Sequence, residues 1–517
     1  MNGAQALITT LVDNDVRVCF ANPGTSEMHF VAALDTVPDM HGVLTLFEGV
    51  ATGAADGYAR IAGKPAAVLL HLGPGLGNGL ANLHNARRAH VPMLVVIGDH
   101  ATYHKRYDAP LESDIDSVAG TVSGWVRRTM SAADVGTDTL AAVGFTRAEH
   151  RIATVILPAD VSWSDGAVIA ETVAGQPDTR EIDFAAAEEV LRSGEPTVIL
   201  VGGDAARAEG LEAAARLALR FGARLFCETF PARLERGSGI PAVERLAYFG
   251  EAAVEQLRGA RRLILAGAAS PVTFFGYPGK PSDLVPEGCE VSTLSGPVGA
   301  AAALAALADA LAADIVAPTA AAARPHLPTG PLTVQTSAEV IGAMLPDRAI
   351  VVDESNTSGL LLPQCTAGAP AHDWLTLTGG AIGYALPVAL GAAIAAPDRP
   401  VLCLESDGSA MYTISALWSH ARENLDITTV VYANRAYDIL RIELQRVGAQ
   451  SGAGPGPEAE SLLDLTPPVL DFVMIAEGTG VPARRVSAAE DLADALRWAF
   501  DEPGPHLIEA VMPSIAG

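Results

Sequence analysis

The sequence predicts an α/β protein made of three doubly wound domains, each built on a parallel sheet. Short apolar runs, typical of strands buried on both faces, alternate with Ala-rich helical stretches. This alternation restarts after about residue 195 and again near residue 349, and 517 residues are too many for one ordinary domain. We therefore place the domains at 1–170, 185–315 and 333–517.

The predicted strands can be assigned in order along the chain. They lie at 16–20, 66–72, 93–98 and 154–158 in the first domain, at 197–203, 223–228 and 262–267 in the second, and at 349–354, 401–405, 427–433 and 506–512 in the third. Helices between parallel strands bring the carboxyl ends of the strands to one edge of each sheet. Residues that follow these runs are therefore the first candidates for a site.

Three further segments interrupt the pattern. Residues 168–195 are charged and mixed in composition, and residues 316–333 are rich in Ala and Pro, so we expect both to be linkers and the second to be extended and exposed. The Gly/Pro-rich segment 450–460 interrupts the third domain. It is either a surface loop or a lid near a site, and the sequence leaves both open.

Composition and charge exclude several classes of function. The formal net charge is −26, which should repel nucleic acid and anionic membranes. The five cysteines include no C-x-x-C pair, so we expect neither a zinc site nor a disulfide framework, and a reduced cytoplasm fits. The N-terminus does not resemble a signal peptide, and no apolar run reaches the roughly 18 residues of a membrane span. We expect a cytoplasmic protein with small-molecule partners.

The glycine-rich segment His71–Gly79 lies between a predicted strand and a predicted helix, which is the position of a dinucleotide-binding turn. The glycine spacing does not match, because position 78 is Asn and position 80 is Leu. No Gly-Lys-Ser/Thr sequence occurs either, so a phosphate loop of the Walker type is not expected.

The turn Ser406–Ser409 follows a predicted strand and opens a helix. Small residues at a helix N-terminus suit a bound anion, yet Asp407 is itself negative. A divalent cation between the carboxylate and a phosphate group removes this conflict. Asn434 ends the next strand, 27 residues after Asp407, so both should lie at one sheet edge. Two side-chain oxygens and phosphate oxygens suit Mg²⁺, and we expect a metal-bound diphosphate here.

These residues resemble the G-D-G-S…N-N motif of thiamine diphosphate-dependent enzymes. Further similar segments occur in the family order at 22–27, 46–65, 73–86, 353–356 and 379–393. They resemble the group of acetolactate synthase, benzoylformate decarboxylase and pyruvate decarboxylase. The resemblance implies an N-terminal pyrimidine-binding domain, a middle domain and a C-terminal diphosphate-binding domain. It also implies a homodimer or homotetramer with each site between subunits.

The resemblance implies a role for each matching residue. The Mg²⁺ ligands would be Asp407, Asn434 and the carbonyl of Ala436. Glu48 would hydrogen-bond the cofactor's pyrimidine ring and activate it, Ile382 would hold the cofactor bent, and the Gly380 carbonyl would accept from its amino group. The other implied cofactor contacts are Pro23, Asn356, Thr357, Gly408, Ser409 and Tyr437. Three positions depart from the family pattern, namely Ser406, Ala433 and Arg435.

Residues above the reacting carbon should decide the outcome of the reaction. His71 and Thr25 resemble the active-site histidine and serine of benzoylformate decarboxylase, whereas the following Gly-Pro-Gly resembles a synthase. The decarboxylase's second histidine is absent, because Gly276 stands in its place. His100 and His104 follow another strand end and could reach the site. The middle domain shows no flavin motif, so FAD is not expected.

The sequence thus indicates a thiamine diphosphate- and Mg²⁺-dependent enzyme acting on a 2-oxo acid. We expect acetolactate synthase-like carboligation after decarboxylation, with an aldehyde or second oxo acid as acceptor. One alternative is a benzoylformate decarboxylase-like enzyme that releases an aldehyde without oxidation. Another is a non-catalytic paralogue that binds the cofactor, which would have little need of Glu48.

Overall fold

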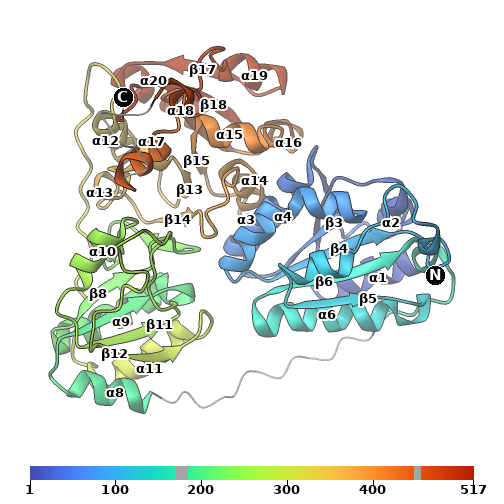
Figure 1. Cartoon of the computed structure of the whole chain (residues 1–517), viewed down its shortest axis with the longest axis horizontal. Helices are drawn as coiled ribbons and strands as arrows, with labels where there is room; N and C mark the ends of the chain where they lie inside the picture. The colour runs from blue at the N-terminus through green and yellow to red at the C-terminus, as the bar shows by residue number, and fades with distance from the viewer. Residues whose placement is uncertain (171–183, 448–455, 517) are drawn as a thin grey trace.

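The computed structural model describes residues 1–170, 184–447 and 456–516, which form three lobes (Figure 1). Each lobe is built around a mainly parallel sheet with helices on its faces, and this confirms the predicted fold class. Residues 171–183 of the predicted linker 168–195 and residues 450–455 of the predicted loop or lid 450–460 lie outside the described residues. Among the described helices, none is both long enough and apolar enough to cross a membrane.

The first sheet has the strand order β2-β1-β3-β4-β6-β5, and all its pairings are parallel. Its strands are β1 (Val18–Ala21), β2 (His41–Leu44), β3 (Ala66–His71), β4 (Met93–Asp99), β5 (Trp125–Arg128) and β6 (Ile152–Pro158). Its helices are α1 (Gly3–Asp13), α2 (Met28–Leu34), α3 (Glu48–Ala62), α4 (Leu72–Arg88), α5 (Ile115–Gly120), α6 (Val135–Glu149) and α7 (Ala159–Trp163). The strands β3 and β4 are buried along almost their whole length, as their unbroken apolar sequences predict.

The middle sheet has the order β10-β8-β7-β11-β12 and is also parallel. Its strands are β7 (Thr197–Val201), β8 (Arg224–Cys227), β10 (Glu244–Arg245), β11 (Arg262–Ala266) and β12 (Glu290–Ser295). Its helices are α8 (Ala185–Arg192), α9 (Ala208–Phe221), α10 (Gly250–Leu257) and α11 (Ala300–Leu311). Helix α8 lies within the predicted linker 168–195 and at the start of the predicted domain 185–315, because Ala187, Val190 and Leu191 form a buried face.

The third sheet has the order β17-β18-β16-β15-β13-β14-β9. Its strands are β13 (Ile350–Glu354), β14 (His372–Thr376), β15 (Val401–Ser406), β16 (Ile427–Ala433), β17 (Ala483–Val486), β18 (His506–Val511) and β9 (Leu234–Arg236). Its helices are α12 (Val334–Met344), α13 (Leu362–Cys365), α14 (Ala385–Ala395), α15 (Asp407–Thr413), α16 (Ala416–Arg422), α17 (Asp438–Arg446), α18 (Pro457–Ser461), α19 (Phe472–Gly478) and α20 (Ala489–Asp501). Strand β9 comes from the middle part of the chain and pairs antiparallel with β14, which the sequence pattern did not predict.

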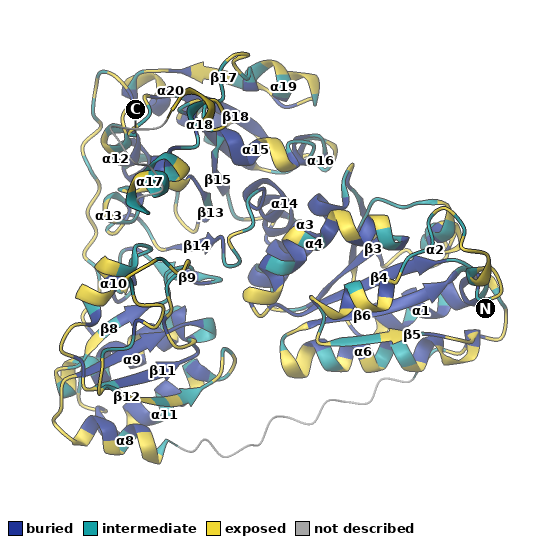
Figure 2. Cartoon of the chain, in the orientation of Figure 1, coloured by how far each residue is buried: buried dark blue, intermediate teal, exposed yellow. Residues whose placement is uncertain are grey.

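Helix α3 joins the first and third domains. Residues 48–60 are all buried, because α3 lies between α4 and α14 (Figure 2). Glycines allow this close approach: a Cβ at Gly57 would clash with the Val388 carbonyl, and one at Gly391 would clash with the Ala54 carbonyl. The crossing of α3 and α14 therefore has backbone in direct contact with backbone.

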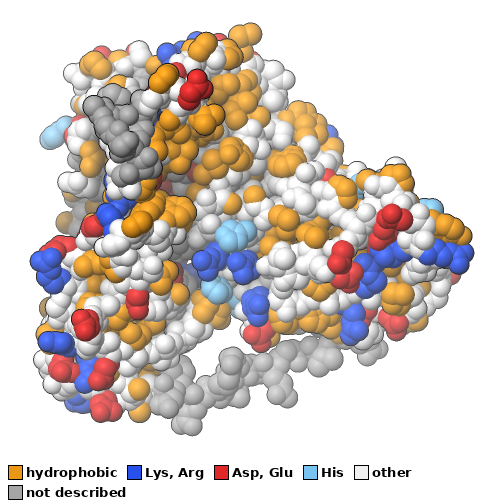
Figure 3. All heavy atoms as spheres, viewed as in Figure 1, with side chains coloured by type: hydrophobic (Ala, Val, Ile, Leu, Met, Phe, Trp, Pro, Cys, Tyr) orange, Lys and Arg blue, Asp and Glu red, His pale blue; other side chains and the backbone are white. Residues whose placement is uncertain are grey.

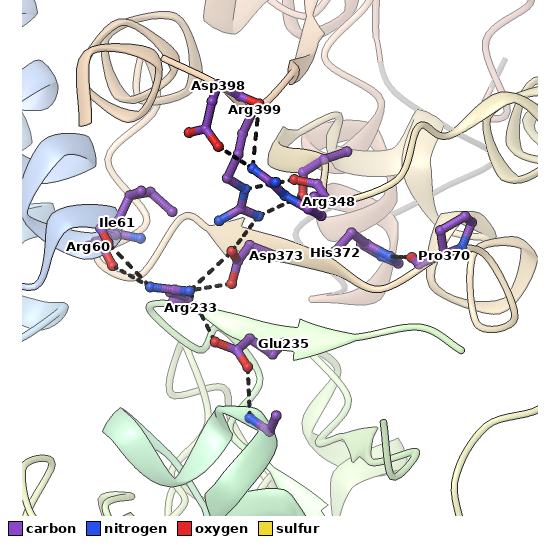
Figure 4. Close-up of polar contacts among 12 residues, drawn as sticks. Arg60, Ile61, Arg233, Glu235, Arg348, Pro370, His372, Asp373, Asp398 and Arg399 are labelled. Carbon is purple, nitrogen blue, oxygen red and sulfur yellow. Dashed lines mark hydrogen bonds and ion pairs between the residues drawn. The ribbon is translucent and has the colours of Figure 1, made fainter. Parts of the chain in front are cut away.

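A polar network centred on Arg233 ties all three domains together (Figure 4). The Arg233 guanidinium pairs with Asp373 of β14 at 2.5 Å and with Glu235 of β9 at 3.0 Å. It also donates to the carbonyls of Arg60 and Ile61 at the end of α3. One side chain thus fixes the position of the first and middle domains against the third.

We predict that Gly57→Ala destabilises the protein by about 1–3 kcal/mol or more, because the new methyl group would meet the α14 backbone, which cannot move aside. Gly144→Ala is the matched control. It also lies within a helix, α6, but an added Cβ there has nothing within 4 Å. This control should be neutral or stabilising by roughly 0.5–1 kcal/mol. Thermal unfolding midpoints measure both, and equal midpoints would contradict the close crossing.

Candidate active site

His71 ends strand β3 and contacts two residues that follow strand β1. Its Nδ1 atom lies 2.9 Å from Glu27 Oε2 and 3.1 Å from Ser26 Oγ. The Glu27 side chain is 1% exposed, whereas that of His71 is 20% exposed. A buried carboxylate that faces Nδ1 favours the tautomer with the ring proton on that nitrogen, in which Nε2 is an acceptor.

Two glycines make room for this pair. A Cβ at Gly24 would clash with the His71 ring, and a Cβ at Gly98 would clash with the Glu27 carboxylate. The Gly24 backbone N–H also donates to Glu27 Oε2 at 2.8 Å. Leu72 follows His71 with a φ of 47°, a left-handed conformation that is strained for leucine and turns the chain directly into α4. The glycine-rich segment is therefore not a loop between strand and helix but the first turns of α4.

Glu48 is the first residue of α3 and lies beside His71. Its side chain is buried, and its Oε2 accepts a hydrogen bond from Asn78 at 3.0 Å. A Cβ at Gly75 would lie 3.3 Å from His71 Cβ and 3.4 Å from Glu48 Oε1, so both side chains border the same glycine. The carboxylate and the imidazole predicted to be catalytic therefore share one edge of the first domain.

The loop 379–383 is clamped between the first and third domains. From α4, Asn85 donates to the Ala381 carbonyl at 2.8 Å, and Asn82 bridges the carbonyls of Gly49 and Gly383. From β13, the Glu354 carboxylate accepts from three consecutive backbone N–H groups, those of Gly383–Ala385. Burial raises the pKa of Glu354 to about 7 despite these donors. The loop that carries Gly380 and Ile382 is thereby held from both sides.

Asp407 and Asn434 lie side by side at the edge of the third sheet. Asp407 accepts from the backbone N–H of Gly408 at 2.8 Å and of Arg435 at 2.6 Å. Asn434 Oδ1 accepts from the Ala436 backbone N–H at 3.2 Å. Arg435, between the two predicted ligands, has a φ of 61°, a left-handed conformation that favours glycine.

The donor set fits Mg²⁺ and a diphosphate. Among the described residues Asp407 forms no ion pair with a basic side chain, and burial raises its pKa to about 6. A buried carboxylate without a counter-charge suits a cation, and carboxylate, amide and carbonyl oxygens are hard ligands. No group of three or more His, Cys, Asp or Glu side chains offers a competing metal site in the part of the chain that the structure describes.

Polar side chains continue the site from Asp407 toward β13. Asn356 donates to Ser406 Oγ at 2.6 Å and to Ser409 Oγ at 3.3 Å. The Tyr437 ring lies against Gly408, where a Cβ would meet it. Thr357 is buried in the turn that follows Asn356. These predicted diphosphate contacts thus lie around one helix start, and their binding role stays a prediction.

Other predicted residues lie less directly at the site. Thr25 is exposed, and its neighbour Ser26 contacts His71 instead. The rings of His100 and His104 lie 5.3 Å apart and form a cluster with Tyr107. Within the described residues, neither ring forms a hydrogen bond or ion pair with His71 or Glu48. Pro23 precedes the Gly24 turn and is partly exposed.

Sequence reasoning missed four residues that shape the site, namely Ser26, Glu27, Asn78 and Glu354. All four lie inside segments that had already been singled out, at 22–27, 73–86 and 353–356. Ser26, Glu27 and Glu354 are polar residues at or shortly after the end of a predicted apolar strand, and Asn78 lies in the glycine-rich segment. This was the available signal, but the pairing partners could not be identified without the fold.

Comparisons with known proteins identify the family. Two family models match, "Thiamine pyrophosphate enzyme, N-terminal TPP binding domain" over residues 1–119 and "Thiamine pyrophosphate enzyme, C-terminal TPP binding domain" over residues 362–510. A Mycobacterium tuberculosis protein named "Putative acetolactate synthase large subunit IlvX" is 72% identical over the full length of both chains. Benzoylformate decarboxylase of Pseudomonas aeruginosa is 30% identical over 96% of each chain. The solved structure of a thiamine diphosphate-dependent 4-hydroxybenzoylformate decarboxylase of Rhodococcus jostii has the same fold, with a TM-score of 0.87 and 24% identity over both whole chains.

We predict that Mg²⁺ binding with thiamine diphosphate depends on pH through Asp407. The folded-state pKa of about 6 lies above the usual 3.8, so in the metal-free protein this carboxyl favours the protonated form and its contribution to stability is lost as the pH rises through 6. The metal requires the carboxylate, so binding should be about tenfold weaker at pH 5 than at pH 7.

The measurement is the shift in the thermal unfolding midpoint on adding metal and cofactor at each pH. With ligand at 100 times Kd, binding should raise the free energy of unfolding by about 2.7 kcal/mol. Asp407→Asn should abolish the shift at both pH values. Asp494→Asn, an exposed control, should leave it unchanged. A shift in the Asp407→Asn variant equal to that of the unaltered protein would refute the assigned metal site.

Proposed function

The chain belongs to the thiamine pyrophosphate-dependent enzymes, and from this premise we propose that it decarboxylates a 2-oxo acid without oxidation and releases an aldehyde. The observation that carries the proposal is the contact of His71 with the buried Glu27, beside Glu48. Mg²⁺ is part of the proposal, held by Asp407, Asn434 and the Ala436 carbonyl.

The cofactor, when bound, supplies a thiazolium carbon that adds to the keto carbon of the substrate and holds the electron pair left by CO₂. Glu48 holds its carboxyl group in a buried position. The low polarity there would strengthen a hydrogen bond between this carboxyl and a ring nitrogen of the cofactor. Asn78 orients this carboxyl through its second oxygen. In the loop 379–383, the Gly380 carbonyl and the Ile382 side chain would form the surface that contacts the cofactor.

His71 has the features of a general acid for the carbon atom that CO₂ leaves. Glu27 holds Nδ1 and stabilises the charged imidazolium, so that Nε2 can deliver a proton and take it back from water. Positioned acid–base groups contribute about 10²–10⁴-fold to rate. Protonation of that carbon leads to the aldehyde, which is why this pair favours decarboxylation.

Acetolactate synthase-like carboligation is the second candidate. It is favoured by the printed name of the relative that is 72% identical and by the Gly-Pro-Gly sequence after Leu72. In that reaction the same carbon attacks the carbonyl of an acceptor aldehyde or oxo acid. A non-catalytic role is not favoured, because the buried Glu48 and the His71–Glu27 pair would have no use in it.

Product analysis separates these candidates. The holoprotein is supplied with pyruvate, phenylglyoxylate or a branched 2-oxo acid, with and without an acceptor aldehyde, and both CO₂ and carbon products are measured. Aldehyde formation equal to CO₂ release supports the decarboxylase. A carboligation product that accounts for the CO₂ supports the synthase, and CO₂ release from none of these acids rejects both.

We predict that His71→Ala lowers kcat by about 10²–10⁴-fold because the proton donor is lost. Glu27→Gln should lower kcat less and shift the pH profile of kcat, because the imidazolium loses its charged partner. Cofactor affinity should remain within about threefold in both variants, since neither residue is assigned to cofactor binding. His29→Ala, an exposed histidine on α2, is the control. Unchanged kcat in His71→Ala would exclude the assigned acid.

We also predict that each site combines Glu48 of one subunit with Asp407 of another. Glu48→Gln chains and Asp407→Asn chains should each be inactive alone. After subunit exchange, mixed dimers should recover one intact site each, about a quarter of all sites in an equal mixture. The measurement is activity before and after exchange, with size-exclusion chromatography to confirm mixed assembly. Mixed dimers without activity would place both residues in one chain.

A further inference from the structure

Six aromatic side chains of the middle domain form a continuous cluster, here called the aromatic wall. The wall consists of Phe230, Tyr248, Phe249, Phe274, Phe275 and Tyr277. Neighbouring ring centroids lie 5.2–6.3 Å apart in edge-on or tilted arrangements. Aromatic residues make up only 5% of the chain, so composition alone does not explain six rings in mutual contact.

The aromatic wall is not part of a hydrophobic core. The core of this side of the middle sheet is built from other residues, such as Phe226, Leu246 and Leu284. Phe274 is 43% exposed and Phe275 is 55% exposed, so both leave aromatic surface in contact with solvent. A contiguous exposed apolar surface of this kind marks a binding site more often than a packing defect.

The aromatic wall reaches the loop assigned to the cofactor. A Cβ at Gly380 would lie 3.0 Å from Phe274 Cε1, so the edge of the Phe274 ring faces this glycine. Gly380 itself is exposed and belongs to the loop clamped by α4 and Glu354. Phe274 therefore borders the same space as the group that the site is proposed to hold.

Contacts with α17 fix the position of the aromatic wall. The Tyr277 hydroxyl donates to Glu443 at 3.0 Å, and the Arg446 guanidinium lies 4.2 Å from the centroid of the Phe249 ring. Helix α17 begins two residues after Ala436, so the wall is tied to the element that follows the metal ligands. Figure 3 shows hydrophobic side chains along this junction of the middle and third domains.

The charges at the aromatic wall are already paired. Arg446 pairs with Glu443 and with Glu251, each at 2.6 Å, and Lys280 also pairs with Glu251. These cations are therefore not free to bind a second carboxylate on a substrate. The wall offers ring faces and edges to a ligand, together with a few neutral polar groups.

Resting on the proposed function, we propose that the aromatic wall binds the side chain of the substrate and that this side chain is an aryl group. An aryl ring matches the offset and edge-on contacts that aromatic clusters form. The methyl group of pyruvate is too small to gain these contacts. The substrate class is therefore an aryl-substituted 2-oxo acid, and Phe274 is the main residue that determines specificity.

The test compares kcat/KM for phenylglyoxylate and pyruvate in the holoenzyme loaded with thiamine diphosphate and Mg²⁺. The unaltered enzyme should prefer phenylglyoxylate. Phe274→Ala should lower kcat/KM for phenylglyoxylate by about 10–100-fold and that for pyruvate by at most about threefold, because only the aryl group uses the ring. Val272→Ala, on the same loop and 65% exposed, is the matched control and should change neither value.

The outcomes separate this inference from the proposed function. Turnover of pyruvate in preference to phenylglyoxylate, or equal losses for both acids in Phe274→Ala, overturns the aryl assignment and leaves decarboxylation standing. No CO₂ from any 2-oxo acid overturns the proposed function itself. If circular dichroism shows that Phe274→Ala is unfolded, Phe275→Ala serves in its place, because its more exposed ring is not needed for packing.

Discussion

The buried ion pair between Arg60 and Asp56 determines where the end of the first domain that carries Glu48 lies. Both side chains are fully buried on α3, and Arg60 also donates to the Thr376 carbonyl and the Tyr384 hydroxyl of the third domain. Removing one partner of such a pair typically costs about 3–5 kcal/mol, because the remaining charge is left buried alone. Helix α3 thus has Glu48 at its start and its anchor to the third domain near its end, so the anchor and the glycine-lined crossing with α14 together set the position of Glu48.

Carboxylates that accept backbone N–H groups hold turns in place in all three domains, and those of the first and third domains are buried. Glu27, Glu354 and Asp407 each accept backbone N–H groups at a turn near the end of a strand. In the middle domain Asp204 accepts from Gly299 and Ala301 at the start of α11. A carboxylate that is satisfied by backbone donors makes a turn rigid, since moving the turn would leave a buried charge without partners. The Asp204 carboxylate thereby caps the N-terminus of α11.

Features that depend on a local pattern or on a fixed spacing along the chain could be predicted from the sequence. Strands such as β3 and β4 were predictable because burial on both faces demands an unbroken apolar run. The proximity of Asp407 and Asn434 followed from parallel topology alone. The contact of His71 with Glu27 was not predictable, because the two residues are 44 positions apart and meet only through the order β1-β3 of the first sheet. The pairing of β9 with β14 of the third sheet was also not predictable, because the three residues of β9 show no clear alternation of apolar and polar side chains.

The aromatic wall and the His71–Glu27 pair bear on the proposed chemistry together. The loop 270–279 contains no histidine and presents aromatic rings instead, so proton transfer in the proposed reaction rests on the first domain. Apolar rings near the reacting carbon would exclude water and lower the local dielectric, which strengthens the interaction of the Glu27 carboxylate with an imidazolium. Proton transfer in the proposed reaction would then need only one histidine, His71, provided that this residue is held rigidly. The close packing at Gly24 and Gly98 and the strained turn at Leu72 provide that rigidity, so in the proposed reaction one histidine with a buried partner would be sufficient.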